Sequence, residues 1–391
     1  MSAFAAPASD PGGSQHGAIL TVDMSAIADN TRTFASRTSR TGAELMAVVK
    51  ANGFGHGAAD VARTALANGA TRVGVTSIDE GLALREAGLL APLLSWLNPV
   101  DADFGSAVSA AIDLAVPSRQ HLDAIVRATA VSGTSRARVH LHLDVGMARD
   151  GAEPAEWPTL CRAARSAEQR GVLHVAGLMG HLGCADVPAD PCNEASRARF
   201  AWGLATARAA CLRPAMRHLA ATSATVTDPG THHTMCRIGA GLVGIDPSHT
   251  VRLRPALTLT APIVGVRPAR AGTPVGYGHA WTAATDTNLA LLPVGYADGL
   301  PRAASGQAEV MVRGRRRPVA GLISMDQIVI DLGDQRVLPG ETATVFGPGG
   351  AGEPTVADWA AWAGTIDHEI VTGIGARVRR RVRGSGLRSV R

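Results

Sequence analysis

The chain has 391 residues, of which 46% are apolar and 18% charged, and its formal net charge is +5. This length predicts two domains, or one large barrel with an added module, and enough apolar material for a sizeable core. No apolar run reaches the length of a membrane span, and residues 1–16 lack the basic and apolar regions of a signal peptide. We therefore expect a cytoplasmic protein with flexible tails at residues 1–16 and 384–391.

Short apolar runs alternate with amphipathic stretches between residues 45 and 245. Each run is bounded by Gly, Pro, Asn, Ser or Asp, as expected of a strand that is buried on both faces. The runs cover residues 45–49, 72–76, 92–97, 113–116, 138–143, 174–179, 217–221 and 236–244. The intervening stretches 57–68, 79–87, 155–169 and 194–210 predict helices, and a glycine follows each of the first two. Eight strands alternating with helices predict a (β/α)8 barrel of the TIM type.

The pattern changes after residue 250, where strand-like runs follow one another without long helices. These runs cover residues 256–266, 288–294, 308–312, 319–322, 327–331 and 342–346. They predict a mostly antiparallel β domain with one helix at 356–363, for which Thr355 is the N-cap. Residues 18–22 predict a further strand of this domain. We therefore expect a barrel at residues 26–248 and a β domain at 17–25 plus 249–383.

Lys50 is the only lysine of the chain, and the other 37 basic side chains are arginines. A bias toward arginine over the whole chain would leave few lysines by itself. However, an arginine stays protonated, whereas a lysine can lose its proton and attack a carbonyl group. Lys50 also follows the first predicted barrel strand, and active-site groups of such barrels lie at the C-terminal ends of the strands.

Other polar groups follow the later barrel strands. They are His142, Asp144, Arg149, His181, Ser223 and the pair Gly239-Ala240. The loops after strands 7 and 8 of a barrel often bind phosphate, and there Ser223 offers a hydroxyl and Gly239-Ala240 offer backbone N–H groups. One lysine and a phosphate site at the same end of the barrel suggest pyridoxal 5′-phosphate (PLP), held as a Schiff base.

Four other patterns are weaker. Residues 239–244 match GxGxxG but lack the preceding strand and following helix of a dinucleotide site. His181 and Cys184 have no further metal ligands at useful spacing, so we expect no metal. The five cysteines, at 161, 184, 192, 211 and 236, contain no CxxC pair and support neither a disulfide framework nor a zinc site. The arginine-rich C-terminus is expected to be a solvated tail rather than a nucleic-acid site.

Several motifs together make the sequence resemble the alanine racemase family of fold type III PLP enzymes, from about residue 18 to 383. The motifs are Ala47-Val48-Val49-Lys50-Ala51-Asn52 with Gly55-His56-Gly57, Asp144-Val145-Gly146-Met147-Ala148-Arg149, His181 with Ala185-Asp186, Arg237-Ile238-Gly239, Val275-Gly276-Tyr277-Gly278, Gly295-Tyr296-Ala297-Asp298-Gly299 and Ser324-Met325-Asp326-Gln327.

The resemblance implies a homodimer in which each active site is shared between subunits. Lys50 would hold PLP and transfer a proton at one face of the substrate Cα, and Tyr277 of the partner subunit would act at the other face. The remaining implied contacts are Arg237 with the pyridine nitrogen, Arg149 with the phenolic oxygen, His181 with the ring, Ser223, Gly239, Ala240 and His368 with the phosphate, and Arg149, Met325 and Tyr296 with the substrate. Racemisation itself requires two such proton-transfer groups on opposite faces of a planar carbanion.

Three positions depart from the family pattern. Phe54 and His368 stand where phosphate-side tyrosines are usual, and His142 stands where many members have a lysine, often carbamylated, that orients the arginine equivalent to Arg149. Arg149 must therefore be placed by another contact. The departures also keep a racemase of serine or another small amino acid open as an alternative to alanine.

Two further classes of function remain possible from the sequence. A non-catalytic PLP-binding or regulatory protein would need only the barrel, so the β domain with Tyr277 argues against it. A decarboxylase or a metal-assisted lyase of the same fold type is less compatible, because decarboxylases of this fold usually place a cysteine opposite the lysine. The interpretation that we favour is a PLP-dependent alanine racemase with a two-base mechanism.

Overall fold

The computed structural model describes residues 17–132 and 136–384. The predicted tails, except for Gly384, lie outside these ranges. The chain divides into two compact units: the barrel unit, from Asp23 to Ala256 with the chain from Val382 onward, and the β unit, with the chain up to Val22 and Leu257–Arg381. The boundary has a local cause, because Asp23 caps the first helix of the barrel unit and Asn30 of that helix accepts a 2.9 Å bond from the N–H of Arg254.

The barrel unit contains an eight-stranded parallel sheet in the order β8-β7-β6-β5-β4-β3-β2-β9. Its strands are β2 (Glu44–Val48), β3 (Arg72–Val75), β4 (Leu93–Ser95), β5 (Ile112–Val116), β6 (Ala137–His142), β7 (Leu173–Met179), β8 (Met216–His218) and β9 (Met235–Ile238). The two edge strands close on each other, since Thr234 N–H donates to the Arg217 carbonyl at 3.1 Å and Arg237 N–H donates to the Ala220 carbonyl at 3.0 Å. The predicted TIM-like barrel is thereby confirmed.

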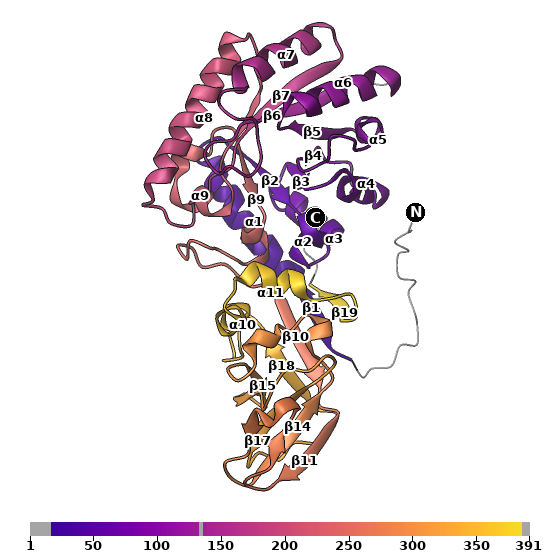
Figure 1. Cartoon of the computed structure of the whole chain (residues 1–391), viewed down its shortest axis with the longest axis vertical. Helices are drawn as coiled ribbons and strands as arrows, with labels where there is room; N and C mark the ends of the chain where they lie inside the picture. The colour runs from indigo at the N-terminus through magenta and orange to yellow at the C-terminus, as the bar shows by residue number, and fades with distance from the viewer. Residues whose placement is uncertain (1–16, 133–135, 385–391) are drawn as a thin grey trace, which may run out of the picture. The chain divides into compact units, whose positions relative to one another are not determined.

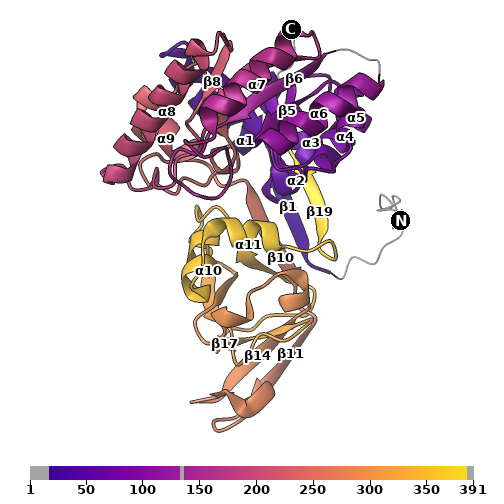
Figure 2. The same cartoon turned by 45° about the horizontal axis from the view of Figure 1, so that its top comes forward.

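Helices surround this sheet, as Figures 1 and 2 show. They are α1 (Met24–Ser39), α2 (Lys50–Phe54), α3 (Ala58–Ala67), α4 (Ile78–Glu86), α5 (Phe104–Ser109), α6 (Arg119–Ser132), α7 (Trp157–Gln169), α8 (Pro191–Ala209) and α9 (Thr222–Thr227). Their start signals are local: Asp23 caps α1, Ser77 and Glu80 form a capping box at α4, and Asp190 caps α8 just before a proline. The faces toward the strands are apolar and buried, as in α7 with Trp157, Leu160 and Ala164.

The eighth predicted strand, 236–244, is wrong beyond its first three residues. β9 ends at Ile238, and residues Ala240–Val243 form the short 3-10 helix η2. Gly241 lies against the ring of Phe34, and Gly244 has a φ of 96° that lets the chain turn back toward Arg254. An apolar run rich in glycine therefore becomes a tight turn, because only residues without Cβ fit there.

The β unit contains three mostly antiparallel sheets, with the orders β16-β15-β18-β10-β1-β19, β11-β14-β17 and β12-β13. The strands are β1 (Ile19–Asp23), β10 (Leu257–Pro262), β11 (Gly265–Ala269), β12 (Pro274–Val275), β13 (Trp281–Thr282), β14 (Thr287–Leu292), β15 (Glu309–Val312), β16 (Arg315–Pro318), β17 (Ile328–Gly333), β18 (Thr342–Phe346) and β19 (Arg379–Arg383). The helices are α10 (Val356–Ala363) and α11 (Asp367–Gly373). As predicted, β1 joins this sheet, where it pairs with β10, and Thr355 caps α10.

Two predicted strands of the β unit need correction. The run 256–266 is two strands, because Ile263 N–H bonds to Glu341 and the next N–H, of Val264, bonds to Leu291, so that the chain changes from one sheet to another. Residues 319–322 were predicted as a strand, but the strand lies just before them: β16, Arg315–Pro318, pairs with β15. The sequence pattern did not predict β16, because three of its four residues are charged and the prediction relied on apolar alternation.

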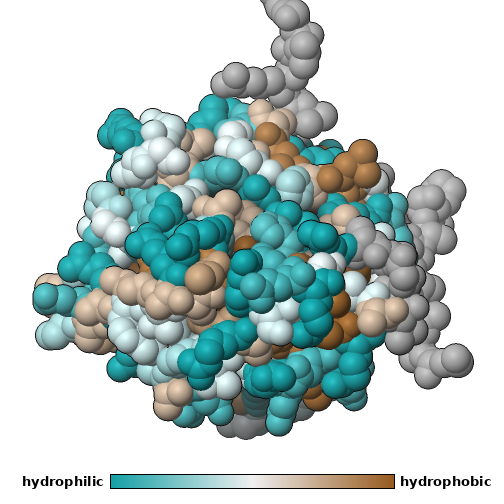
Figure 3. Space-filling model, turned by 90° about the horizontal axis from the view of Figure 1, so that it is seen from above, coloured by the Kyte–Doolittle hydropathy of each residue, from teal (hydrophilic) through white to brown (hydrophobic). Residues whose placement is uncertain are grey.

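The face shown in Figure 3 is mainly hydrophilic, with apolar patches between the polar residues. Among the described residues, no helix combines the length and apolar character needed to cross a membrane.

Candidate active site

Lys50 lies directly after β2, at the C-terminal end of the barrel sheet. The backbone that follows it is left-handed, with φ of 51° at Ala51, 53° at Asn52 and 55° at Phe54. This conformation costs L-residues about 1–2 kcal/mol each, so other contacts must hold it. Glu80 Oε1 accepts a 2.7 Å bond from Ala51 N–H, and Asn52 Oδ1 accepts a 3.0 Å bond from Ala58 N–H.

The pKa of the Lys50 amine is lowered from its ordinary value. Burial is the main cause, because a charged ammonium loses hydration there, and the positive charge of Arg149 acts in the same direction against the opposing charge of Glu80. An amine must be unprotonated to attack a carbonyl group or to accept a proton. The site therefore favours the reactive form of the only lysine in the chain.

Arg237 is buried at the end of β9, and its guanidinium is held by the barrel interior. Nη1 donates to the His218 carbonyl at 2.9 Å and to His218 Nδ1 at 3.0 Å, while Nη2 donates to the Gly180 carbonyl at 2.8 Å. Nη2 also lies 3.2 Å from His181 Nδ1. Burial lowers the pKa of Arg237 to about 10, which still leaves it a cation at neutral pH. None of the hydrogen bonds among the described residues involves its Nε.

A line of hydrogen bonds continues from Arg237 across the barrel. His218 Nε2 lies 2.8 Å from His140 Nδ1, and His140 Nε2 lies 3.3 Å from Asp113 Oδ2. Because Nδ1 of His218 accepts from Arg237, both imidazoles are neutral and each donates toward Asp113. Burial lowers the pKa of both histidines. Gly177 leaves room for this line, since a Cβ there would overlap with the His140 ring.

His181 follows β7 and is also neutral. Burial, and next the charge of Arg237, lower its pKa to about 3. Its Nδ1 accepts from Arg237, so its proton is on Nε2. A neutral, half-buried imidazole is suited to pack against a flat aromatic group at the barrel end.

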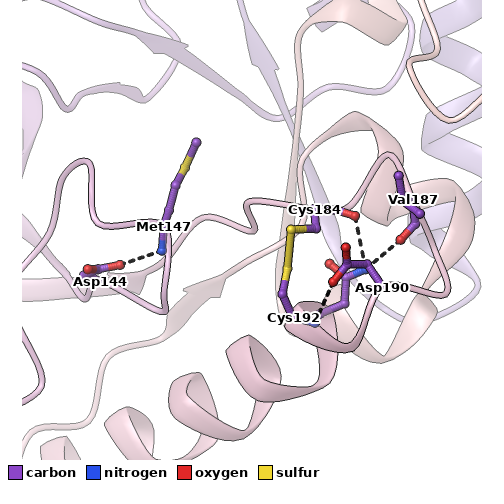
Figure 4. Close-up of a disulfide and its surroundings, with 7 residues drawn as sticks. Asp144, Met147, Cys184, Val187, Asp190 and Cys192 are labelled. Atoms are coloured by element: carbon purple, nitrogen blue, oxygen red, sulfur yellow. Dashed lines mark hydrogen bonds between the residues drawn. A yellow bond between two sulfur atoms is a disulfide. The ribbon is translucent and has the colours of Figure 1, made fainter.

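Arg149 lies in the exposed loop that follows β6. The carboxylate of Asp144 shapes this loop by accepting from the N–H groups of Gly146 at 2.8 Å, Met147 at 3.0 Å and Ala148 at 3.2 Å. Figure 4 shows the contact with Met147. The arrangement requires a φ of 53° at Ala148, just before Arg149.

Ser223, Gly239 and Ala240 gather after β8 and β9. The two segments run side by side, since Gly241 N–H donates to Thr222 Oγ1 at 3.2 Å and Arg237 N–H donates to the Ala220 carbonyl. The buried ring of Phe54 fills the space next to Gly239, where an added Cβ would lie 2.7 Å from Cζ. The hydroxyl of Ser223 and the N–H groups at the start of η2 are suitable donors for a phosphate. A lysine amine, a phosphate site and a buried cation thus fit PLP.

Four predicted site residues belong to the β unit: Tyr277, Tyr296, Met325 and His368. The structure brings Tyr296 and Met325 together, because Ala297 N–H donates to the Met325 carbonyl at 2.9 Å. Tyr277 follows β12, the residue is 69% exposed, and no hydrogen bond among the described residues involves its hydroxyl. His368 is the second residue of α11.

The expectation that the cysteines support no disulfide is wrong, because Cys184 and Cys192 form one (Figure 4). Their Cα atoms are 6.5 Å apart and join the loop after β7 to the first turn of α8. Asn193 Nδ2 donates to the carbonyls of Cys184 at 3.2 Å and Val187 at 3.0 Å, so the loop folds back on the helix start. Within the described residues, Cys184, Asp190 and Cys192 are also the one grouping spaced to hold a metal, but the disulfide uses both sulfurs.

Several residues around the site were not predicted. They are Glu80, Asp113, His140, Asp150 and His218. The sequence Ser77 to Glu80 has the pattern of a helix capping box. The bond from Ala51 N–H to Glu80, next to Lys50, had no such signal, because it depends on the barrel bringing α4 to α2. The histidines of the interior line had no signal, since a histidine on an apolar strand is usually a core residue.

A closed parallel barrel with a lysine at a strand end, joined to a mostly antiparallel β unit, is typical of a class of two-domain enzymes. Two family models match the chain: "Alanine racemase, N-terminal domain" over residues 22–247 and "Alanine racemase, C-terminal domain" over residues 256–382. The chain belongs to the alanine racemase family, whose members are isomerases.

Individual relatives are similar to this chain over nearly their whole length. The alanine racemase of Thermobifida fusca is 44% identical over 362 residues, covering 92% of this chain and 96% of that protein. The alanine racemase of Mycobacterium avium is 45% identical, covering 93% and 94%. Among solved structures, the alanine racemase of D-cycloserine-producing Streptomyces lavendulae matches with a TM-score of 0.92 at 38% identity, covering 95% of this chain and 98% of that one. The Streptomyces coelicolor alanine racemase gives 0.91 at 43%, covering 94% and 98%.

Proposed function

We propose that this protein interconverts L- and D-alanine, with PLP bound covalently through the amine of Lys50. The observation that carries the proposal is the half-buried Lys50 amine, whose pKa is lowered, at the same barrel end as the phosphate donors Ser223, Gly239 and Ala240. The similarity to proteins described as alanine racemases supports alanine as the substrate. When bound, PLP supplies an electron sink for the charge that develops at the substrate Cα.

The chain's own residues divide the work of holding this group. Ser223 and the backbone N–H groups of Gly239 and Ala240 bind the phosphate, with His368 as a further phosphate-side donor. Arg149 would face the phenolic oxygen, and His181 would pack against the ring. Arg237 uses its Nη atoms within the barrel and would present Nε to the pyridine nitrogen.

Arg237 also determines which reactions are disfavoured. A guanidinium with a pKa of about 10 remains a cation and is a poor proton donor at neutral pH. A pyridine nitrogen held beside it would stay unprotonated, so that less of the negative charge would spread from Cα into the ring. Protonation at Cα is favoured over transamination in such an arrangement.

Two groups move the proton. Lys50 Nζ accepts or delivers it at one face of Cα, and Tyr277 Oη of the partner subunit in a homodimer does so at the other face. The exposure of Tyr277 supports this role, because a phenol without a hydrogen bond among the described residues is available to a second copy of the chain. The backbone of Met325 and the side chain of Arg149 hold the substrate carboxylate, and Tyr296 lines the entrance.

A chiral assay of the purified protein with L- and D-alanine and with L- and D-serine tests the proposal. We expect racemisation of alanine in both directions and an absorbance band from the bound cofactor. Faster turnover of serine would favour the serine alternative. A colourless protein that racemises neither amino acid would overturn the proposal and favour a non-catalytic role.

The two-base assignment has its own test. Tyr277→Phe should abolish exchange of the Cα hydrogen with deuterated solvent from one alanine enantiomer and retain it from the other, because Lys50 still serves its own face. Unchanged exchange from both enantiomers would show that Tyr277 is not a proton-transfer group. Borohydride reduction followed by peptide mapping should place the cofactor on Lys50.

A further inference from the structure

A contact between a buried imidazole and a carboxylate links the loop that carries Arg149 to the end of β6. His142 is the last residue of β6, and its imidazole is buried in the barrel end. Its Nδ1 is 3.3 Å from Oδ2 of Asp150, an ion-pair separation rather than a well-aligned hydrogen bond. Asp150 directly follows Arg149, so the contact joins the end of a rigid strand to the residue next to the arginine.

We propose that His142 and Asp150 form a clamp that positions Arg149. This proposal rests on the proposed function, because Arg149 is there the contact of cofactor and substrate, and His142 and Asp150 act only through it. They are positioning residues.

The rest of the loop explains why one more anchor is needed. Its two ends are fixed on β6, since Ala152 N–H donates to the His142 carbonyl at 2.8 Å and Asp144 N–H donates to the Ala152 carbonyl at 3.0 Å. Asp144 fixes residues 146–148 through their N–H groups. Residues 149 and 150 lie between these two anchored segments.

The side chain of Asp150 supplies that anchor with both of its oxygens. Oδ1 accepts a 2.8 Å bond from Gly151 N–H, and Oδ2 faces His142. Gly151 has a φ of 107°, and a Cβ there would lie 2.6 Å from the backbone nitrogen of Asp144. The turn therefore requires a glycine at this position. Among the described residues, Arg149 itself forms no hydrogen bond or ion pair, so only the backbone anchors of the loop hold it in place.

The charges also favour the clamp. Burial opposes ionisation of Asp150, but the contact with His142 and the Gly151 N–H outweigh it, and the pKa of Asp150 lies below its ordinary value. His121 adds a smaller contribution of the same sign. An ionised Asp150 places a negative charge beside the imidazole of His142, directly after the cation Arg149 in the chain.

Asp150→Asn tests the clamp, because it keeps an oxygen for Gly151 and removes the charge toward His142. Asp123→Asn is the matched control, since Asp123 forms an exposed 2.9 Å pair with Arg119 on α6, away from the loop. We expect Asp150→Asn, but not the control, to increase amide hydrogen exchange of residues 149–152 in the purified protein. His142→Ala should give the same exchange pattern, and it serves as a second variant if the first folds poorly.

A double-mutant cycle shows whether the effect passes through Arg149. We expect Asp150→Asn to raise the dissociation constant of PLP and the KM for alanine by about tenfold, since small misplacements of a binding group are costly. In an Arg149→Ala background the same change should add no more than about twofold. An equal penalty in both backgrounds, or unchanged exchange of residues 149–152 in both single variants, would overturn the clamp. If the wild-type protein does not racemise alanine, the proposed function fails while the exchange measurement still tests the clamp.

Discussion

Nη1 of Arg237 donates a hydrogen bond to Nδ1 of His218 across 3.0 Å inside the barrel. This contact fixes the tautomer of His218 and, through it, the tautomer of His140, so that both imidazoles donate toward Asp113. A buried cation is tolerated at the end of β9 because carbonyl groups and a neutral imidazole surround it and a carboxylate ends the line.

Replacing His218 with leucine should strongly destabilise the protein. The change leaves Nη1 of Arg237 with only a carbonyl partner and removes the partner of His140 Nδ1, and each unsatisfied buried polar group costs about 1–3 kcal/mol. We expect the free energy of unfolding in urea to fall by roughly 2–5 kcal/mol. His174→Leu is the control, because His174 is exposed on β7; a similar loss in both variants would contradict the importance of the line.

The free energy of unfolding should fall as the pH drops below about 6.5. His140, His181 and His218 all have lowered pKa values in the fold, so in acid the unfolded chain binds more protons than the folded one. Stability therefore rises with pH in this range, by up to about 1.4 kcal/mol per pH unit for each histidine. For His181 the window extends from its ordinary value down to a pKa of about 3.

Urea unfolding at several pH values between 7 and 5 measures this slope. His181→Asn should make the slope shallower, because it removes one of the groups that titrate only after unfolding. A free energy of unfolding that does not change between pH 6.5 and 5 would contradict the neutral state of these histidines.

The disulfide predicts a thiol count and a stability difference. The denatured protein should show three free thiols before reduction, from Cys161, Cys211 and Cys236, and five afterwards. Closing a loop of this size stabilises a fold by about 2.5 kcal/mol in the chain-entropy model. Cys192→Ser should lower the free energy of unfolding by roughly that amount, and Cys211→Ser, at an exposed free cysteine, should not; five thiols without reductant would show that the bond does not form.

Phe54→Tyr should strengthen PLP binding if the cofactor's phosphate lies next to Gly239. The ring of Phe54 packs against Gly239, and a hydroxyl added there would give a further donor to a charged group. Such a bond is worth about 1.5–3 kcal/mol, so the dissociation constant of PLP should fall by about tenfold or more. Equilibrium titration of the cofactor-free protein measures it; a constant that is unchanged or higher would place the phosphate elsewhere.

The alternation of buried strands and amphipathic helices predicted the barrel well, because parallel strands are buried on both faces and their sequences are continuous apolar runs. The prediction failed where glycines turned an apolar run into a 3-10 helix and a tight turn, as at Gly241 and Gly244. It also failed where charged residues formed a strand, as at Arg315–Pro318. Such outcomes depend on what the neighbouring element offers, which the local pattern does not contain.

The same limit applies to the site. Lys50 and Ser223 were predicted because strand ends in a barrel share one face, and Arg237 was predicted from the family resemblance. The contacts of Asp150 with His142, of Glu80 with Ala51 and of Cys184 with Cys192 join residues 8 to 29 positions apart. Only the closed fold determines which of many possible pairs meet.

The left-handed turn after Lys50 has a backbone conformation that would suit D-residues in a chemically synthesised chain. Ala51, Asn52 and Phe54 adopt a hand of backbone that L-residues disfavour and that D-residues adopt without penalty, by mirror symmetry. A D-alanine introduced at position 51 would therefore fit the turn better than the natural residue. The segment that holds the reactive amine thus has a backbone suited to the mirror-image form of alanine, the form that we propose the enzyme makes from L-alanine.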